Sequence, residues 1–220
     1  MFPFEKYGTK ISVLFCHKYS KVVITVQIKR KGTTMLRILC LYLAFHASSL
    51  YSEQMPPQSI YDISVKSLEG QTIPLSAFRG RVLLIVNTAS LDRNATQMTQ
   101  LEELYQKYQE PGFIVLAFPC TDFNNEESGS SSDVRAAYQQ KFHVTFPVLE
   151  PVHVTGSNKS PLYKYLTDYK TDPNFCWEVD WSFTKFLIGR DGKILNRFST
   201  NTLPNDPKVV QAIEKALAQQ

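Results

Sequence analysis

Residues 81–86 read Arg-Val-Leu-Leu-Ile-Val, and residues 113–118 read Phe-Ile-Val-Leu-Ala-Phe. Continuous apolar runs of this length, rich in β-branched residues, are typical of strands buried on both faces of a sheet. Between the two runs, apolar side chains recur at helical spacing and predict a helix over residues 96–109. A strand, a helix and a second strand of these lengths predict a βαβ unit with parallel strands and a right-handed crossover.

Shorter elements are expected on either side of this unit. An alternating run at residues 60–65 predicts a strand, and residues 72–75 predict a return strand after the turn at Glu69-Gly70. A polar, Ser-rich stretch predicts a surface loop at 124–132. Helices are predicted at 133–142, with Ser132 or Asp133 as the cap, at 161–169 and at 207–218. Residues 183–188 and 194–198 are predicted to pair as a hairpin around the Asp191-Gly192 turn. We find no internal repeat and no linker, so we predict one α/β domain with a central mixed sheet over residues 53–220.

The chain has a different character before this domain. Basic residues at 29–31 and at Arg37 precede a short apolar run at 38–45, and small residues follow that run. This order is typical of a secretory signal peptide. We therefore expect a signal peptide at 35–52 and a secreted or periplasmic protein, with a buried amphipathic segment as the alternative.

Met35 opens this pattern, so residues 1–34 are expected to be a disordered upstream extension or a start-codon artefact. Eight of the 24 Lys and Arg residues of the chain lie in residues 1–37, together with one acidic residue, although the net charge of the whole chain is only +4. The remainder is mildly acidic and carries no basic stripe, which argues against nucleic-acid binding. No run approaches the roughly 20 apolar residues of a membrane helix, so no membrane association is expected after cleavage.

Two of the four cysteines, Cys120 and Cys176, belong to the predicted mature domain. The sequence contains no Cys-x-x-Cys, which excludes a redox pair of the thioredoxin type. An exported protein could join Cys120 and Cys176 in a disulfide, and the sequence leaves both redox states open.

Four sequence blocks at the ends of the predicted elements occur in a specific order. They are Leu84–Ser90, Leu116–Phe123, Val144–Val148 and Trp181–Leu187. In order and spacing these blocks resemble the glutathione peroxidase family, over about residues 60 to 217. The resemblance implies a thioredoxin-like α/β fold. The insertion of tetrameric members is missing between Tyr169 and Trp181, which indicates a monomer.

This family reduces hydroperoxides with a cysteine thiolate or a selenolate, assisted by Gln, Trp and Asn side chains. The resemblance places Asp92 at the position of the sulfur or selenium, or Leu91 if one residue is deleted nearby. It places Asp122 at the Gln position, Trp181 at the Trp position and Ser182 at the Asn position, so only Trp181 is retained. No cysteine lies between Cys40 and Cys120. Because a carboxylate has no reversible two-electron oxidation of the kind a thiolate undergoes, we expect the family's chemistry to be lost.

Three hypotheses remain open for the function. The first is a non-catalytic glutathione peroxidase homologue that acts as a binding or scaffold protein. The second is an active thiol peroxidase that uses Cys120 and Cys176 as a relocated pair, with glutathione or a thioredoxin-like protein as reductant; alternatively, these are an ordinary buried cysteine and a loop thiol. The third is a divalent cation held by Asp92 and Asp122, with Ser182 or Asp180 assisting. No cofactor is expected, and two solvated acids are the simpler interpretation of the two aspartates.

Overall fold

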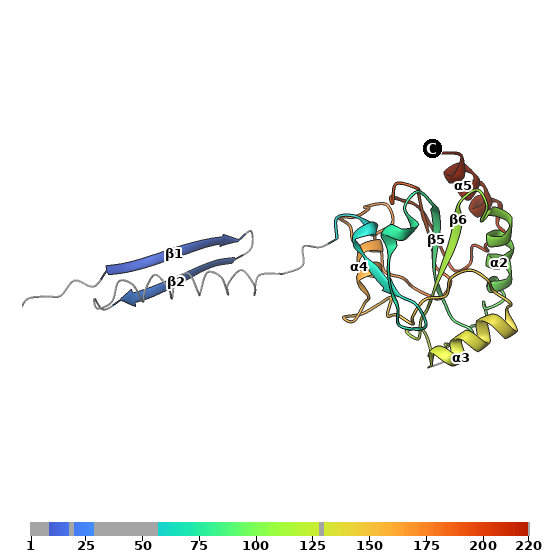
Figure 1. The fold of residues 1–220 in the computed structure, drawn as a ribbon, viewed down its shortest axis with the longest axis horizontal. Helices are drawn as coiled ribbons and strands as arrows, with labels where there is room; N and C mark the ends of the chain where they lie inside the picture. The colour runs from blue at the N-terminus through green and yellow to red at the C-terminus, as the bar shows by residue number, and fades with distance from the viewer. Residues whose placement is uncertain (1–8, 18–19, 29–56, 128–129, 220) are drawn as a thin grey trace, which may run out of the picture. The chain divides into compact units, whose positions relative to one another are not determined.

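The computed structural model describes residues 9–17, 20–28, 57–127 and 130–219 (Figure 1). The chain divides into two compact units, residues 1–55 and 56–220. In the first unit, β1 (Thr9–His17) and β2 (Ser20–Ile28) pair antiparallel. Both segments contain several β-branched residues, which are typical of strands; that residues 1–34 are a disordered extension or a start-codon artefact stays a prediction. The signal peptide predicted at 35–52 lies outside the described residues.

The second unit is built on a sheet with strand order β6-β5-β7-β8. Its strands are β5 (Val82–Thr88), β6 (Phe113–Pro119), β7 (Lys185–Ile188) and β8 (Ile194–Phe198). β5 pairs parallel with β6 and antiparallel with β7, which pairs antiparallel with β8. The helix between β5 and β6 is α2 (Gln97–Tyr108). The predicted βαβ unit and mixed sheet are therefore confirmed.

Both faces of the sheet are covered, which explains the uninterrupted apolar runs. Val82, Leu84 and Val86 of β5 pack in one core with α2 and with α5 (Pro207–Ala218). Leu83 and Ile85 point the other way, into a second core with α4 (Pro161–Leu166). Figure 1 shows α2 and α5 on one side of the sheet and α4 on the other. Successive side chains of a strand alternate between faces, so only a continuous apolar run fills both cores.

The segment at 60–65 forms a short helix before its strand. Residues Ile60–Asp62 form the 3-10 helix η1, and β3 (Ser64–Lys66) follows and pairs with β4 (Thr72–Pro74). Ser59 Oγ accepts from the Tyr61 amide, and the Asp62 carboxylate accepts from the Ser59 amide at 2.9 Å. This reciprocal capping favours a helical turn over the predicted strand. A further 3-10 helix, η2 (Leu75–Phe78), leads into β5.

Two of the predicted helices have different bounds in the structure. α3 spans Ser131–Ala136 and continues as a π-helical turn, η3 (Ala137–Lys141). Its cap is Ser130, whose Oγ accepts from the Asp133 amide at 3.1 Å, rather than Ser132 or Asp133. α4 ends at Leu166 instead of continuing to residue 169. The C-terminal helix and the hairpin of β7 and β8 are confirmed, with Gly192 at φ 86° in the turn.

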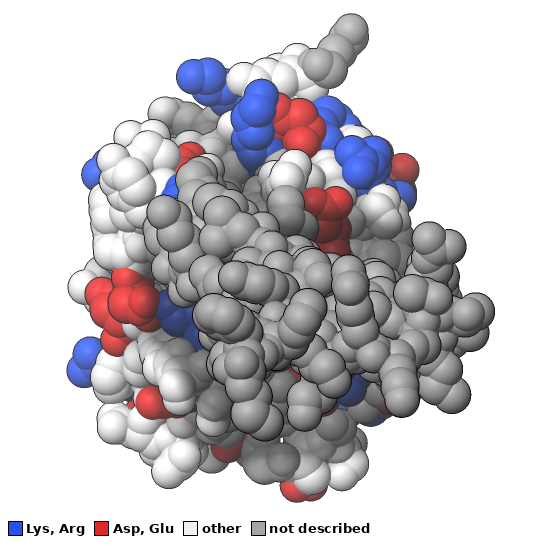
Figure 2. Space-filling view, turned by 90° about the vertical axis from the view of Figure 1, so that its left-hand side faces the viewer, with Lys and Arg blue, Asp and Glu red and all other residues white. Residues whose placement is uncertain are grey.

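The surface carries acidic and basic groups side by side. On the face shown in Figure 2, Lys and Arg are interspersed with Asp and Glu where the described residues are visible. None of the helices in the described parts of the chain has the length and apolarity required to cross a bilayer.

Candidate functional site

The candidate site lies where three strands meet at one edge of the sheet. β5 and β6 run parallel, so both of their carboxyl ends lie at this edge, and antiparallel β7 begins there. Open α/β sheets bind ligands at the carboxyl ends of their parallel strands. The predicted site residues follow β5 and β6 and precede β7, so the topology brings their segments together.

Asn87 fixes the segment that enters β7. Its side-chain amide donates to the Trp181 carbonyl at 3.0 Å, and its side-chain oxygen accepts from the Thr184 amide at 3.1 Å. The Asn87 carbonyl also accepts from the Phe183 amide at 2.6 Å. Phe183 has a φ of 63°, a left-handed conformation that is costly for a bulky residue. These bonds hold the turn that presents the Trp181 indole to the end of β5.

Asp92 is the residue that receives this indole. Trp181 Nε1 donates to Asp92 Oδ2 at 2.8 Å, and Asp92 Oδ1 accepts from the Asn94 amide at 2.6 Å and from Asn94 Nδ2 at 2.8 Å. The Asp92 side chain is 4% exposed, whereas Leu91 is 65% exposed. The resemblance left Asp92 and Leu91 as the two candidate positions for the family's sulfur or selenium. Of these two residues, Asp92 is the one that is hydrogen-bonded to Trp181.

Two residues of the loop after β6, Phe123 and Glu126, also belong to the site around Asp92 and Trp181. The Phe123 ring stacks on Trp181 with 5.5 Å between the ring centroids and 28° between the planes. The Leu91 amide donates to the Glu126 carbonyl at 2.9 Å. The Asp92 carboxyl group, followed by partial burial, raises the pKa of Glu126 above its ordinary value. In the sequence, Glu126 is one of several polar residues in a loop, and no local pattern distinguishes it from its neighbours. Its position seven residues after β6, a buried strand of the βαβ unit, was the available signal.

The segment 124–132 was predicted to be a surface loop, but the side chain of Glu127 within it is buried. It is 5% exposed, and its carboxylate accepts from the Ser90 amide at 3.1 Å and from Ser90 Oγ at 2.6 Å. The buried Tyr138 hydroxyl donates to Glu127 Oε2 at 2.6 Å. Burial, followed by the charge of Glu127, raises the pKa of Tyr138 well above its ordinary value. This anchor joins the loop to the end of β5, next to Asp92.

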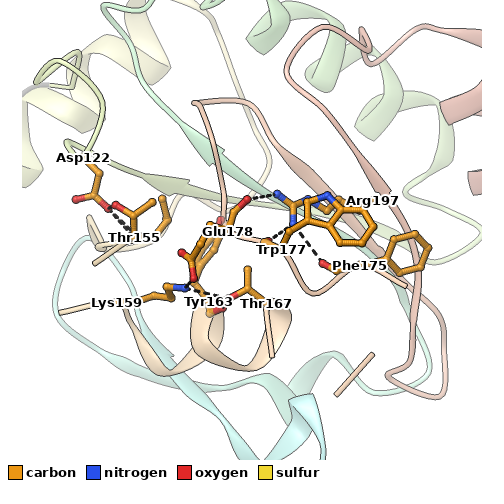
Figure 3. A network of polar contacts seen from close by, with 10 residues as sticks. Asp122, Thr155, Lys159, Tyr163, Thr167, Phe175, Trp177, Glu178 and Arg197 are labelled. Carbon is orange, nitrogen blue, oxygen red and sulfur yellow. Dashed lines mark hydrogen bonds and ion pairs between the residues drawn. The ribbon is translucent and has the colours of Figure 1, made fainter. Parts of the chain in front are cut away.

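Asp122 has a separate set of donors (Figure 3). Its carboxylate accepts from His153 Nδ1 at 2.6 Å, from the Val154 amide at 2.6 Å and from the Thr155 amide at 3.0 Å. Burial opposes ionisation, but the hydrogen bonds from His153 and the two amides outweigh it and hold the pKa of Asp122 below its ordinary value. The structure therefore uses Asp122 to fix the 153–155 turn, whereas Trp181 is bonded to Asp92.

The remaining predicted ligands do not assemble a cation site. Ser182 is fully buried, and its Oγ has no hydrogen-bond partner among the described residues. Asp180 is exposed. Over residues 57–127 and 130–219, no cluster of three or more His, Cys, Asp or Glu side chains is arranged to hold a metal ion.

Both cysteines of the domain are free thiols in the structure. Cys120 is fully buried, and desolvation raises the pKa of its thiol to about 12. Cys176 is partly exposed, with its Sγ 3.6 Å from the Pro173 carbonyl. A thiol with so high a pKa holds little thiolate at neutral pH, and the thiolate is the form that attacks peroxide. The relocated pair stays a hypothesis, and the geometry favours an ordinary buried cysteine at 120.

A polar network supports the segment that leads to Trp181. The Arg197 guanidinium donates to the carbonyls of Phe175, Trp177 and Glu178. The buried Lys159 ammonium binds Glu178 and also donates to Thr167 Oγ1 at 3.1 Å. Figure 3 shows these groups converging on the 175–178 segment from β8 and from either end of α4. The indole is thus positioned by groups from several elements.

A family model described as glutathione peroxidase matches residues 60–167. The chain is 40% identical over 171 residues to "Probable glutathione peroxidase 5" of Arabidopsis thaliana, which covers 77% of this chain and 96% of that protein. The chain belongs to the glutathione peroxidase family. A second relative is the glutathione peroxidase-like peroxiredoxin gpx1 of Schizosaccharomyces pombe, 40% identical over 144 residues, or 66% of this chain and 90% of that protein.

Solved structures confirm the thioredoxin-like fold. A crystal structure described as Trgpx in apo form superposes with a TM-score of 0.59 and 34% identity, and covers 74% of this chain and 98% of that one. A thiol:disulfide interchange protein of the thioredoxin family from Chlorobium tepidum has a TM-score of 0.53, covering 75% of this chain and 99% of its own. At 12% identity, this second likeness shows the fold alone.

Proposed function

We propose that this chain is a glutathione peroxidase homologue whose site no longer carries the family's thiolate chemistry and serves in binding instead. The observation that carries the proposal is the bond from Trp181 Nε1 to Asp92 Oδ2 at 2.8 Å. In the family the corresponding Trp assists the sulfur or selenium, so a carboxylate oxygen here stands where the reactive atom would be. Reduction of a hydroperoxide needs an atom that gains and then returns oxygen, as a sulfenic acid does, and a carboxylate offers no such step.

The donors around Asp92 support this assignment. Three N–H groups, two from Asn94 and one from Trp181, converge on its carboxylate. Such donors favour an anion, whether that anion is a thiolate or a carboxylate. The scaffold of an anionic site is therefore kept while the redox-active atom is absent. The relatives found by similarity support a thiol reductant, glutathione or a thioredoxin-like protein, as the class of partner bound.

We also propose that the domain is exported and acts as a monomer. The basic, apolar and small-residue pattern at 35–52 supports export. The short connection between Tyr169 and Trp181 supports the monomer, because it leaves no room for the insertion of tetrameric relatives.

The test is a coupled NADPH assay with hydrogen peroxide, supplied first with glutathione and then with thioredoxin. We expect no turnover by the wild type with either reductant. The Asp92→Cys variant places a thiol among the same three donors and is expected to consume peroxide at least stoichiometrically. Asp92→Ser is the matched control, because it has similar size and no sulfur, and it is expected to stay inactive.

Variants of the two native cysteines separate the alternatives. Wild-type turnover that disappears in Cys120→Ser would establish the relocated pair and overturn the proposal. Turnover that persists after both Cys120 and Cys176 are replaced by Ser would show peroxide chemistry that uses neither of these thiols. Circular dichroism of each variant shows that it is folded before its activity is compared.

A further inference from the structure

We propose that a pocket between the 175–180 segment, the end of β8 and the start of α5 binds a small aromatic molecule that carries one negative charge. The pocket has a volume of about 410 Å³, within the roughly 300–1,000 Å³ typical of ligand pockets. Neither Asp92 nor Trp181 lines it, so the inference goes beyond the proposed function and does not depend on peroxide chemistry. Aromatic rings, hydroxyl groups and cations make up most of its wall, among them those of Phe175, Trp177, Arg197, Ser199, Thr202 and Lys208.

The aromatic wall of this pocket is exposed and held in place. Trp177 is 61% exposed, which is uncommon for so large an apolar side chain. The Arg197 guanidinium donates to the carbonyls of Phe175 and Trp177, and its central carbon lies 5.9 Å from the centroid of the Trp177 ring (Figure 3). Because these bonds fix the backbone of both aromatic residues in advance, little conformational entropy is lost when a ligand ring stacks on Trp177.

Two cations of the pocket keep donors for a ligand. Lys208, in the first turn of α5, is exposed, and its ammonium group forms no ion pair with a described residue. Arg197 makes three bonds to backbone carbonyls, whereas a guanidinium has five N–H groups. The hydroxyl groups of Ser199 and Thr202, whose oxygens are 3.4 Å apart, add neutral donors. A carboxylate is the group that such a set of donors binds best.

The balance of charge limits the ligand to a single negative charge. One acid, Asp180, also lines the pocket and is exposed. Arg197 and Lys208 together outweigh it, so the charged side chains of the pocket sum to one positive charge. An exposed tryptophan can also bind cations on its face, but here Arg197 already lies beside the ring and repels a second cation. The charge of the pocket therefore favours an aromatic anion over an aromatic cation.

Four small probes test the ring and the charge separately on the full-length wild-type protein. Phenylacetate has both, phenylacetamide keeps the ring without the charge, phenethylamine carries the opposite charge, and acetate lacks the ring. NMR follows the indole N–H signals of the two tryptophans of the chain, which Trp177→Phe assigns. We expect phenylacetate to shift the Trp177 signal to saturation, to leave the Trp181 signal in place, and to bind more tightly than each of the other three probes.

Charge variants then test the residues of the pocket. Lys208→Gln should weaken phenylacetate binding about threefold, and Asp180→Asn should strengthen it by a similar factor, as expected for exposed charge pairs. Lys215→Gln is the matched control, because it makes the same charge change at an exposed position of α5 that does not line the pocket. It should leave the Kd of phenylacetate unchanged.

Three outcomes would overturn the proposal. The first is the absence of a saturable shift of the Trp177 signal with phenylacetate. The second is binding of phenylacetamide or phenethylamine as tight as that of phenylacetate, because the pocket would then not select an anion. The third is a Kd for phenylacetate that is the same in Lys208→Gln and Lys215→Gln. The comparison of the four probes uses the wild type alone, so it does not depend on how any variant folds.

Discussion

The Asn87 side-chain amide donates to the Trp181 carbonyl at 3.0 Å, although 94 residues separate the two in sequence. Asn87 is the penultimate residue of β5, and Trp181 precedes β7, the strand that pairs with β5 on its other side. Both polar atoms of the Asn87 side chain are bonded to the segment that enters β7. The position of the indole, and with it the contact to Asp92, thus depends on a residue within β5.

Replacing Asn87 by Ala should release this segment. The substitution leaves the Thr184 amide and the Trp181 carbonyl without their side-chain partner inside the protein. We expect a loss of about 2–3 kcal/mol in the free energy of unfolding, measured by urea denaturation, together with a red shift of Trp181 emission. The exposed Asn201 provides the control Asn201→Ala, which should change stability by no more than about 0.5 kcal/mol. Equal effects of the two substitutions would refute the positioning role.

Tyr138 and Tyr163 form a natural matched pair, since both side chains are fully buried. The Tyr138 hydroxyl lies 2.6 Å from Glu127 Oε2 and 2.7 Å from Thr88 Oγ1, whereas the Tyr163 hydroxyl has no partner among the described residues. Tyr138→Phe leaves Glu127 short of a donor and should cost about 1–3 kcal/mol of stability. Tyr163→Phe removes an unsatisfied group and should be neutral or stabilising by up to about 1 kcal/mol. Thermal and urea denaturation check both values, and a larger loss for Tyr163→Phe would contradict the structure.

Lys185 should make stability depend on pH above neutrality. Burial lowers the pKa of its ammonium group from 10.5 to about 7 in the folded chain. Between about pH 7 and 10.5 the unfolded chain holds the proton that the folded chain has lost, so the stability contributed by this group rises with pH. The slope is up to about 1.4 kcal/mol per pH unit.

The apolar variant Lys185→Met isolates this effect. It removes the titrating group, which donates to the Phe183 carbonyl at 2.7 Å, and keeps a side chain of similar length. The difference in unfolding free energy between wild type and variant should shift in favour of the wild type from pH 7 to pH 9, as measured by urea denaturation. A difference that stays constant over this range would show that Lys185 is charged in the folded chain throughout.

The two thiols of the domain should differ in reactivity. Cys120 is fully buried with a pKa raised to about 12, and Cys176 is partly exposed. At pH 7.5 a thiol reagent such as DTNB should modify Cys176 much faster than Cys120 in the native domain, because reaction needs an accessible thiolate. Cys176→Ser should remove the part of the fast phase that this thiol contributes, and Cys120→Ser should leave the fast phase unchanged. Faster modification of Cys120 than of Cys176 would instead support the hypothesis that Cys120 is a nucleophile.

The sequence by itself determined the βαβ unit, the final hairpin and the C-terminal helix. Their signals are local: uninterrupted apolar runs, helical spacing and an Asp-Gly turn each specify one element. The ordered blocks around these elements also indicated the glutathione peroxidase family, which the comparisons confirm. The lack of a cysteine between Cys40 and Cys120 is likewise a property of the sequence alone.

Only the tertiary structure decided which acidic side chain accepts the hydrogen bond from the Trp181 indole. Asp122 and Asp92 both follow buried strands, yet the 153–155 turn satisfies one and the indole satisfies the other. Glu126 and Glu127 are neighbours in a polar loop, but only in the fold does Asp92 raise the pKa of Glu126 and does Ser90 Oγ donate to Glu127. Such partners come from distant parts of the chain, so local composition cannot predict them. The electrostatics of the site therefore arise only when the strands assemble.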